Sequence, residues 1–306
     1  MSTETTGHEI LDRYRVISGK LKKRFLRKPN VTEASESFVK LGQQCESQDL
    51  PSYAALSWMA AARCEGSLGN IPGETSYMIR SARQFLNAEE KDFSTGCVRV
   101  PSDNLQAGLS CFNHAAIRCP EECTIPVGLE LEIVEFLKRI DRNEYIETYI
   151  RNSVEISEGR PKAKIHSLDL LGSHFISSGD YVAALKSYLE VSDTLCQFHD
   201  SGYKSELLLK CEVNCVFLLL ILHPVPQKLS PKLGKILEKY AWGDKNDKSI
   251  ESCHMSEKMF LLLQSLVIMC QSFDTNGLTE LEGEFWPLLS NEQKDLLRLL
   301  VGTYQL

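Results

Sequence analysis

The hydrophobic positions of this chain repeat with the period of an α-helix almost from end to end. In the first segment the apolar residues are Ile10, Tyr14, Ile17, Leu21 and Phe25. Spacings of three and four place them on one helical face. Pro29 ends the pattern, because proline lacks the backbone donor that a continuing helix needs. We therefore predict a helix over about 8–28.

The same periodicity predicts a series of helices joined by short turns. The second would be capped by Thr32 and end before Pro51. The others are expected at 53–64, 74–88, 104–118, 126–141, 144–157, 162–177, 180–198, 203–222, 230–242, 255–273, 278–286 and 290–304. Ser290 and Gln293 form a capping box at the start of the last one. No segment alternates as a strand does, so the predicted fold class is all-α, with a polar loop over about 243–253.

One stretch, residues 165–198, carries a repeat motif. Its first half reads Leu168-x2-Leu171-Gly172-x2-Phe175, and its second half has Gly179 at a turn and Ala184-x3-Tyr188. This is the tetratricopeptide pattern, in which small residues let the two helices of a hairpin approach closely. Weaker copies are Leu129–Ile140 with Tyr145, and Leu41-Gly42 with Ala54–Trp58. Since one repeat cannot bury its faces alone, we predict a tetratricopeptide-like superhelix, an α-solenoid, forming a single domain over 1–306.

Charge is distributed unevenly over the 306 residues. The formal net charge is −7, yet residues 1–28 hold eight of the 34 Lys+Arg and only three of the 41 Asp+Glu. A head of charge +5 therefore precedes a body of charge −12. An acidic body is unsuited to non-specific nucleic-acid binding. Eleven cysteines without a dense framework indicate a reducing compartment, and the apolar run Cys215–Leu222 is far shorter than a membrane span. We expect a soluble, cytoplasmic protein.

Candidate chemistry is sparse. Four residues could be considered as zinc ligands: Cys111, His114, Cys119 and Cys123. Their spacing matches no common zinc site, and Pro120 interrupts it, so thiols facing a core are the favoured interpretation. The chain has no phosphate-binding loop, dinucleotide fingerprint or nucleophile elbow. We predict a protein that is not an enzyme and needs no cofactor, with a zinc-binding or enzymatic domain as the alternative.

A basic stretch at the end of the first predicted helix is the sharpest feature. Its members are Lys20, Lys22, Lys23, Arg24, Phe25, Arg27 and Lys28. On a helix the cations would cover more than half of the circumference, with Leu21 and Phe25 on the remaining stripe. A solvated helix end, a nuclear import signal and a site for membrane phosphates are alternatives. Because crowded like charges repel, we favour docking to an acidic protein partner, with Phe25 as an anchor.

The segment around this stretch resembles a known family. Residues 14–31, YRVISGKLKKRFLRKPNV, are similar to the N-terminal signature of the forty-kilodalton huntingtin-associated proteins, also called the factor VIII intron 22 protein family. Residues 237–242, 260–267 and 286–289 resemble it too. The resemblance implies a tetratricopeptide-like scaffold bound one to one between the HEAT-repeat arms of huntingtin, which it stabilises. It also implies a link to the small GTPase Rab5 on early endosomes, in vesicle trafficking; the nucleus is a further expected location.

A second interpretation keeps the fold and changes the partner. Soluble attachment proteins, which act in vesicle fusion, are also tetratricopeptide-like, so the chain could be an adaptor of that kind. Binding to membrane SNARE bundles would distinguish this interpretation from the huntingtin scaffold. Neither interpretation requires an active site.

Overall fold

The structure, a computed structural model, describes residues 2–21, 30–96, 103–199, 201–223, 231–242 and 255–305. Throughout these ranges the regular elements are α-helices and short 3₁₀ helices, with no strand. The chain divides into two compact units, Met1–Ile156 and Ser157–Leu306. Most consecutive helices pack against each other within each unit, which confirms the predicted all-α solenoid of helical hairpins.

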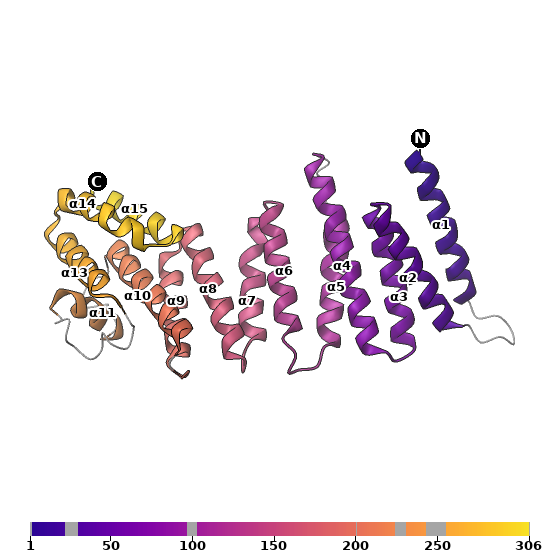
Figure 1. The fold of residues 1–306 in the computed structure, drawn as a ribbon, viewed down its shortest axis with the longest axis horizontal. Helices are drawn as coiled ribbons and strands as arrows, with labels where there is room; N and C mark the ends of the chain where they lie inside the picture. Colours follow the sequence, from indigo (N-terminus) through magenta and orange to yellow (C-terminus); the bar gives the residue numbers. More distant parts are fainter. Residues whose placement is uncertain are drawn as a thin grey trace. The chain divides into compact units, whose positions relative to one another are not determined.

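Unit 1 is a row of helices that each pack against the next one along the chain (Figure 1). They are α1 (Ser2–Leu21), α2 (Val31–Ser47), α3 (Pro51–Ser67), α4 (Ile71–Ser94), α5 (Asp103–Arg118), α6 (Ile125–Arg139), the 3₁₀ turn η1 (Asn143–Tyr145) and α7 (Ile146–Ile156). Packing is extensive from α2 to α5 and much weaker between α5 and α6. The row is therefore least tightly joined where residues 119–124 connect α5 to α6.

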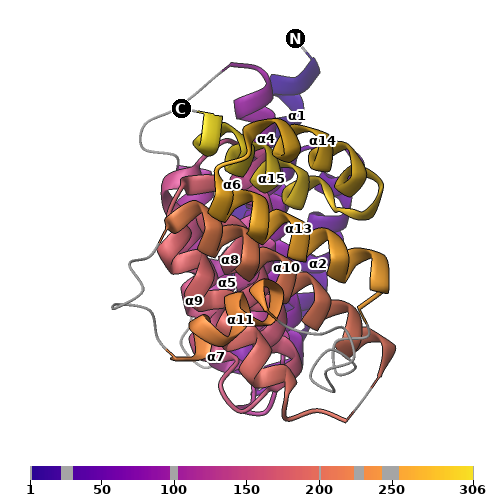
Figure 2. The same ribbon diagram turned by 90° about the vertical axis from the view of Figure 1, so that its left-hand side faces the viewer.

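Unit 2 begins in the same way and then departs from a simple row. Its elements are α8 (Pro161–Ser178), α9 (Tyr181–Leu195), α10 (Gly202–Leu222), α11 (Pro231–Ala241), α13 (Glu257–Ser272), α14 (Thr275–Phe285), the 3₁₀ turn η3 (Trp286–Leu288) and α15 (Asn291–Gln305). The first three pack in chain order. The last helix, α15, returns to pack against α10 and runs across it (Figures 1 and 2).

Helix α1 joins the row through the predicted stripe. Ile10 is buried, and Tyr14, Ile17 and Leu21 pack against the core that α2 and α3 provide. The ring of Tyr14 lies 5.2 Å from that of Phe38 on α2. Full burial of an apolar side chain contributes about 1.5–3 kcal/mol, and the partly buried members of the stripe contribute less than that.

Several helix starts differ from the predictions: α1 begins at Ser2 rather than about 8, and α14 begins at Thr275 rather than 278. Asn30, not Thr32, caps α2, and its side chain accepts a hydrogen bond from the amide of Glu33 at 3.2 Å. Helix α4 begins at Ile71 rather than 74 because proline is tolerated in a first helical turn and Asn70 caps it. The predicted capping box is confirmed: the Ser290 amide donates to Gln293 Oε1 at 3.2 Å, and the Gln293 amide donates to Ser290 Oγ at 3.3 Å.

The hairpin at 165–198 has the predicted close approach. A Cβ added to Gly172 on α8 would lie 2.8 Å from the ring of Tyr188 on α9, which is fully buried. Gly179 ends α8 with a left-handed φ of 82°, and Asp180 caps α9. Here only glycine provides the turn without strain. The tetratricopeptide-like hairpin is thus built as its motif predicted.

The chain was predicted to form a single domain, and the structure divides it into two compact units. Whether the two units form one domain stays a prediction. No helix among the described residues is long and apolar enough to cross a membrane.

Candidate interaction surface

The basic stretch falls mostly outside the described residues. Lys20 is its one described cation: it lies in the last turn of α1, is about half exposed, and pairs with Glu33 of α2 at 3.3 Å. The other members, Lys22, Lys23, Arg24, Phe25, Arg27 and Lys28, lie outside the described ranges. Docking of this stretch to an acidic partner stays a prediction.

The four candidate zinc ligands have separate partners. His114 Nε2 lies 2.7 Å from Glu74 Oε1, while the buried thiol of Cys111 contacts Ser81 Oγ at 3.7 Å. Cys119 and Cys123 lie on the connection after α5 and contact each other. Within the described ranges, no three or more His, Cys, Asp or Glu side chains are grouped so that they could hold a metal ion. The described structure therefore does not bring these four residues together.

Burial disfavours the thiolate form of cysteines elsewhere in the chain. Burial raises the pKa of Cys45 to about 11 and that of Cys270 to about 11, and it also raises the pKa of Cys215 on the apolar helix α10. The thiolate is the nucleophilic form of cysteine, so these groups are not activated nucleophiles. The interpretation of Cys211 and Cys215 as small core residues agrees with their burial.

Sequence reasoning missed a large groove within unit 1. It has a volume of about 1340 Å³ and lies between one face of α4 and the first two turns of α6, with the α5–α6 connection along one side. We call it the α4–α6 groove. Its lining includes three isoleucines and three arginines: Ile71, Ile79, Ile125, Arg80, Arg83 and Arg118.

Three arginines at this groove are each paired with a carboxylate of unit 1. Arg83 on α4 binds Glu132 on α6 through Nε and Nη2 at 2.7 and 2.9 Å, bridging the two sides. Arg118 Nε lies 3.3 Å from Glu74 Oε2. The carboxylate side chains are 33% and 5% exposed, whereas the two arginines are 58% and 45% exposed. The arginines therefore cover the carboxylates and face solvent themselves.

The third arginine belongs to a cluster around Glu46 at the end of α2. Arg80 binds this carboxylate through Nε and Nη2, and Trp58 Nε1 donates to it at 2.8 Å. The guanidinium also lies over the indole, 4.1 Å from the ring centroid. Gln84 adds a further donor at 3.0 Å. One carboxylate thus ties α2, α3 and α4 together and fixes the orientation of Arg80 at the groove.

Apolar side chains lie beside these charges. Ile71, at the first position of α4, is 47% exposed, and Ile125, at the first position of α6, is 43% exposed. Ile79, eight residues after Ile71 on α4, also lines the groove and is half-buried. It follows Met78, which belongs to the buried stripe of that helix. An apolar residue beside the core stripe was the signal that could have revealed this second face.

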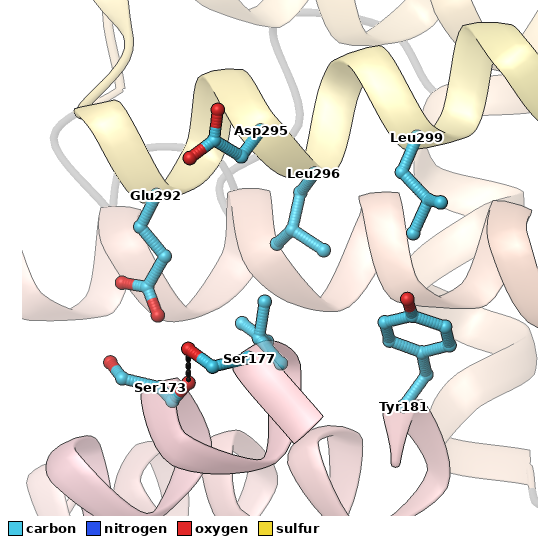
Figure 3. Close-up of a pocket in the computed structure, with 8 residues that line it drawn as sticks. Ser173, Ser177, Tyr181, Glu292, Asp295, Leu296 and Leu299 are labelled. Atoms are coloured by element: carbon cyan, nitrogen blue, oxygen red, sulfur yellow. Dashed lines mark hydrogen bonds between the residues drawn. The ribbon is translucent and has the colours of Figure 1, made fainter. Parts of the chain in front are cut away.

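A smaller cavity of about 540 Å³ lies within unit 2, between α15 and the end of α8 (Figure 3). Leu296 and Leu299 of α15 face it with Asp295, and Tyr181 and Ser177 lie opposite. Ser177 Oγ donates to the backbone carbonyl of Ser173 at 3.0 Å. Glu292 also lines this cavity, and it accepts a hydrogen bond from Tyr188 Oη at 3.4 Å.

Comparison with known proteins gives a family. No family model matches the chain. The 40-kDa huntingtin-associated proteins of Mus musculus and Rattus norvegicus are each 31% identical to it, over 96% of this chain and 92% of theirs. Among solved structures, a circular tandem repeat protein with novel repeat topology and enhanced subunit contact surfaces aligns with 97% of this chain and 75% of its own. The TM-score is 0.39 and the sequence identity is 14%, which is too weak a likeness for a conclusion on fold or function. The two curated relatives span nearly the whole chain at substantial identity, and the chain therefore belongs to the family of 40-kDa huntingtin-associated proteins.

Proposed function

We propose that this chain is a non-catalytic scaffold subunit that associates with huntingtin. The main observation in support of this proposal is the 31% sequence identity to two huntingtin-associated proteins over 96% of the chain. Tandem helical hairpins supply long exposed surfaces for protein contacts, as solenoid repeats do generally. In the finer form of the proposal, the subunit binds one to one between the HEAT-repeat arms of huntingtin and stabilises that large solenoid.

The basic stretch is the proposed contact for an acidic surface of huntingtin. Six cations lie between Lys20 and Lys28, in a chain of net charge −7. Concentrated charge of one sign accelerates association with a surface of the opposite sign and excludes wrong partners. Phe25, placed among these cations, would anchor the contact in an apolar pocket.

Charge reversal tests this contact. The variant with Lys22, Lys23, Arg24 and Arg27 changed to Glu should bind purified huntingtin at least tenfold more weakly than the unmodified chain, since about 1.4 kcal/mol suffices for that factor. The matched control changes four exposed lysines elsewhere, Lys40, Lys162, Lys186 and Lys235, to Glu. If the two variants bind equally well, the basic stretch is not part of the interface.

The proposal extends to Rab5 and early endosomes through the family resemblance. In this form the chain would link huntingtin to Rab5 on the endosome surface. Binding assays with Rab5 loaded with GDP or with a GTP analogue test it directly. Equal, negligible retention of both forms by the assembled complex would remove Rab5 from the account.

A further inference from the structure

We infer that the α4–α6 groove is a second docking site, and that it receives an acidic amphipathic helix of the partner protein. The inference rests on the proposed association with huntingtin and adds the location and chemistry of one contact. It is independent of the basic stretch, since the groove is formed by α4, the α5–α6 connection and α6.

The dimensions of the groove suit a helix. Its α4 side extends from Ile71 to Gln84, which is about 20 Å at 1.5 Å per residue. Together with a volume of about 1340 Å³, this length gives a mean cross-section of about 70 Å², similar to that of a helix about 10 Å across. A partner helix of roughly three turns would therefore occupy the groove along α4.

The apolar positions suit the anchors of an amphipathic helix. Ile71, Ile79 and Ile125 all contribute to the lining, and two of them leave more than two fifths of their surface exposed. Helices that bind in grooves insert apolar side chains from positions i, i+3, i+4 and i+7. Covering these isoleucines would remove apolar surface from water, at roughly 25 cal/mol per Å².

The charged positions favour an acidic helix over a basic one. Each guanidinium has five N–H donors in a planar fork, and a bidentate bond to one carboxylate uses two of them. Arg80 and Arg83 make such bonds with Glu46 and Glu132, yet their side chains remain 47% and 58% exposed. Glu46 and Glu132 also line the groove, but their side chains are only 21% and 33% exposed, so an approaching segment meets more guanidinium surface than carboxylate surface. Aspartate or glutamate on the partner helix would bond to their exposed edges.

The groove is also preorganised. Arg83 is held across the groove by Glu132, and Arg80 is held by Glu46 and by the ring of Trp58. Side chains that are already ordered lose less conformational entropy on binding, which leaves more of the contact energy as affinity.

The test uses the full chain and purified huntingtin, with affinity measured by biolayer interferometry. The main variant is Ile71→Glu with Ile125→Glu, which places two carboxylates at the groove. Both positions are exposed first residues of helices, where glutamate is favoured by the helix dipole, so the fold should persist. The control is Val182→Glu with Tyr203→Glu, at two exposed positions in the first turns of α9 and α10, outside the groove lining. We expect the groove variant to bind at least tenfold more weakly than the control, as repulsive juxtaposition implies.

A second pair of variants isolates the charge. Arg83→Gln should weaken binding and reduce its dependence on salt, whereas Arg83→Lys keeps the charge and most of the affinity. A photo-cross-linking residue at Ser76, which is exposed and lines the groove, should label an acidic, amphipathic helical segment of huntingtin. The same residue placed at Val182 should not label that segment.

The outcomes separate the two proposals. If the unmodified chain binds huntingtin and the groove variants match the control, the groove is not a docking site and the proposed association stands. Cross-links to a basic or non-helical segment would overturn the acidic-helix occupant. If the unmodified chain does not bind huntingtin, the proposed function fails, and this inference fails with it.

Discussion

Two hairpins, one in each unit, have a glycine of the first helix packed against a buried aromatic ring of the second helix. The ring is a tryptophan in one hairpin and a tyrosine in the other. In α2–α3 of unit 1, a Cβ on Gly42 would lie 2.9 Å from the indole of Trp58. In α8–α9 of unit 2, a Cβ on Gly172 would lie 2.8 Å from the ring of Tyr188. Each aromatic residue follows its glycine by sixteen positions and is fully buried. The glycine and the ring are both positions of the tetratricopeptide pattern, and their equal spacing and contact identify α2–α3 and α8–α9 as hairpins of the same kind.

The hairpins differ in the residue that accepts a hydrogen bond from the polar group of the buried aromatic side chain. Trp58 Nε1 donates to Glu46 at 2.8 Å, and that carboxylate also binds Arg80. Tyr188 donates to Glu292 of α15 over a longer 3.4 Å. The first ring is thus bonded within a row of neighbouring helices, while the second is bonded to a helix far along the chain. The same hairpin can be joined to its surroundings in two ways.

Removing the rings should have the largest effect. Trp58→Ala and Tyr188→Ala should each lower the free energy of unfolding by about 3–5 kcal/mol, because a large buried side chain leaves a cavity. Urea unfolding followed by circular dichroism measures this loss. Tyr188→Phe keeps the ring volume and should cost far less. A small effect of either alanine variant would mean that its ring does not hold the hairpin together.

Adding one methyl group to the glycines should have the next largest effect. Gly42→Ala and Gly172→Ala should each destabilise the protein by about 1–3 kcal/mol, because the facing ring is enclosed and cannot move away. The control is Gly302→Ala on α15, where nothing lies within 4 Å of the added Cβ. It should stabilise by about 0.5–1 kcal/mol through helix propensity. Similar behaviour of all three variants in urea unfolding would contradict the shared register.

The carboxylates test the difference between the hairpins. Glu46→Gln should cost about 1.5–3 kcal/mol, since it removes charge-assisted bonds at 2.8–2.9 Å from Trp58 and Arg80. Glu292→Gln should cost less, because its bond to Tyr188 is long at 3.4 Å and its ion pair with Lys210 is 3.8 Å. Both are read from urea midpoints. An equal or reversed order would show that the two rings are not supported differently.

A third hairpin, α6–α7, should show the smallest effect, as a dependence on pH. Burial raises the pKa of Glu130 from 4.5 to about 7, opposed by a hydrogen bond from Asn152. The folded state therefore holds this proton more tightly than the unfolded state does. The stability it contributes is complete below about pH 4.5 and is lost as the pH rises through about 7. After allowance for solvent screening, the loss is on the order of 1 kcal/mol.

Glu130→Gln is the matched variant for this pH effect, because glutamine resembles the protonated acid and does not titrate. The difference in unfolding midpoint between the native chain and this variant should change between about pH 4.5 and 7, with the native chain losing more. Parallel midpoints over that range would show that Glu130 is solvated like an ordinary surface carboxylate.

Much of the fold could be predicted from the sequence because its signals are local. The stripe of α1, the motif at 165–198 and the capping box before α15 all depend on residues within a few turns of one another. The start of α4 was missed, because Pro72 and Gly73 read as a turn although proline and a capping Asn70 suit a first turn. The Gly42–Trp58 register was visible only as a degenerate copy.

The groove could not be predicted for a different reason. Arg83 and Glu132 face each other across it and are separated by 49 residues. No local pattern relates two such positions, so only the arrangement of α4 and α6 brings them together. The predicted basic stretch was found from local charge alone, and its proposed role rests on the sequence, since all but Lys20 lies outside the described residues.

The central claim is that this helical-repeat chain is a stoichiometric partner of huntingtin. Purified chain and purified huntingtin should be mixed at near-physiological salt and separated by size-exclusion chromatography with mass determined by light scattering. The account predicts a single complex containing one copy of each protein. Elution of the chain as a free, folded monomer beside unchanged huntingtin would contradict it.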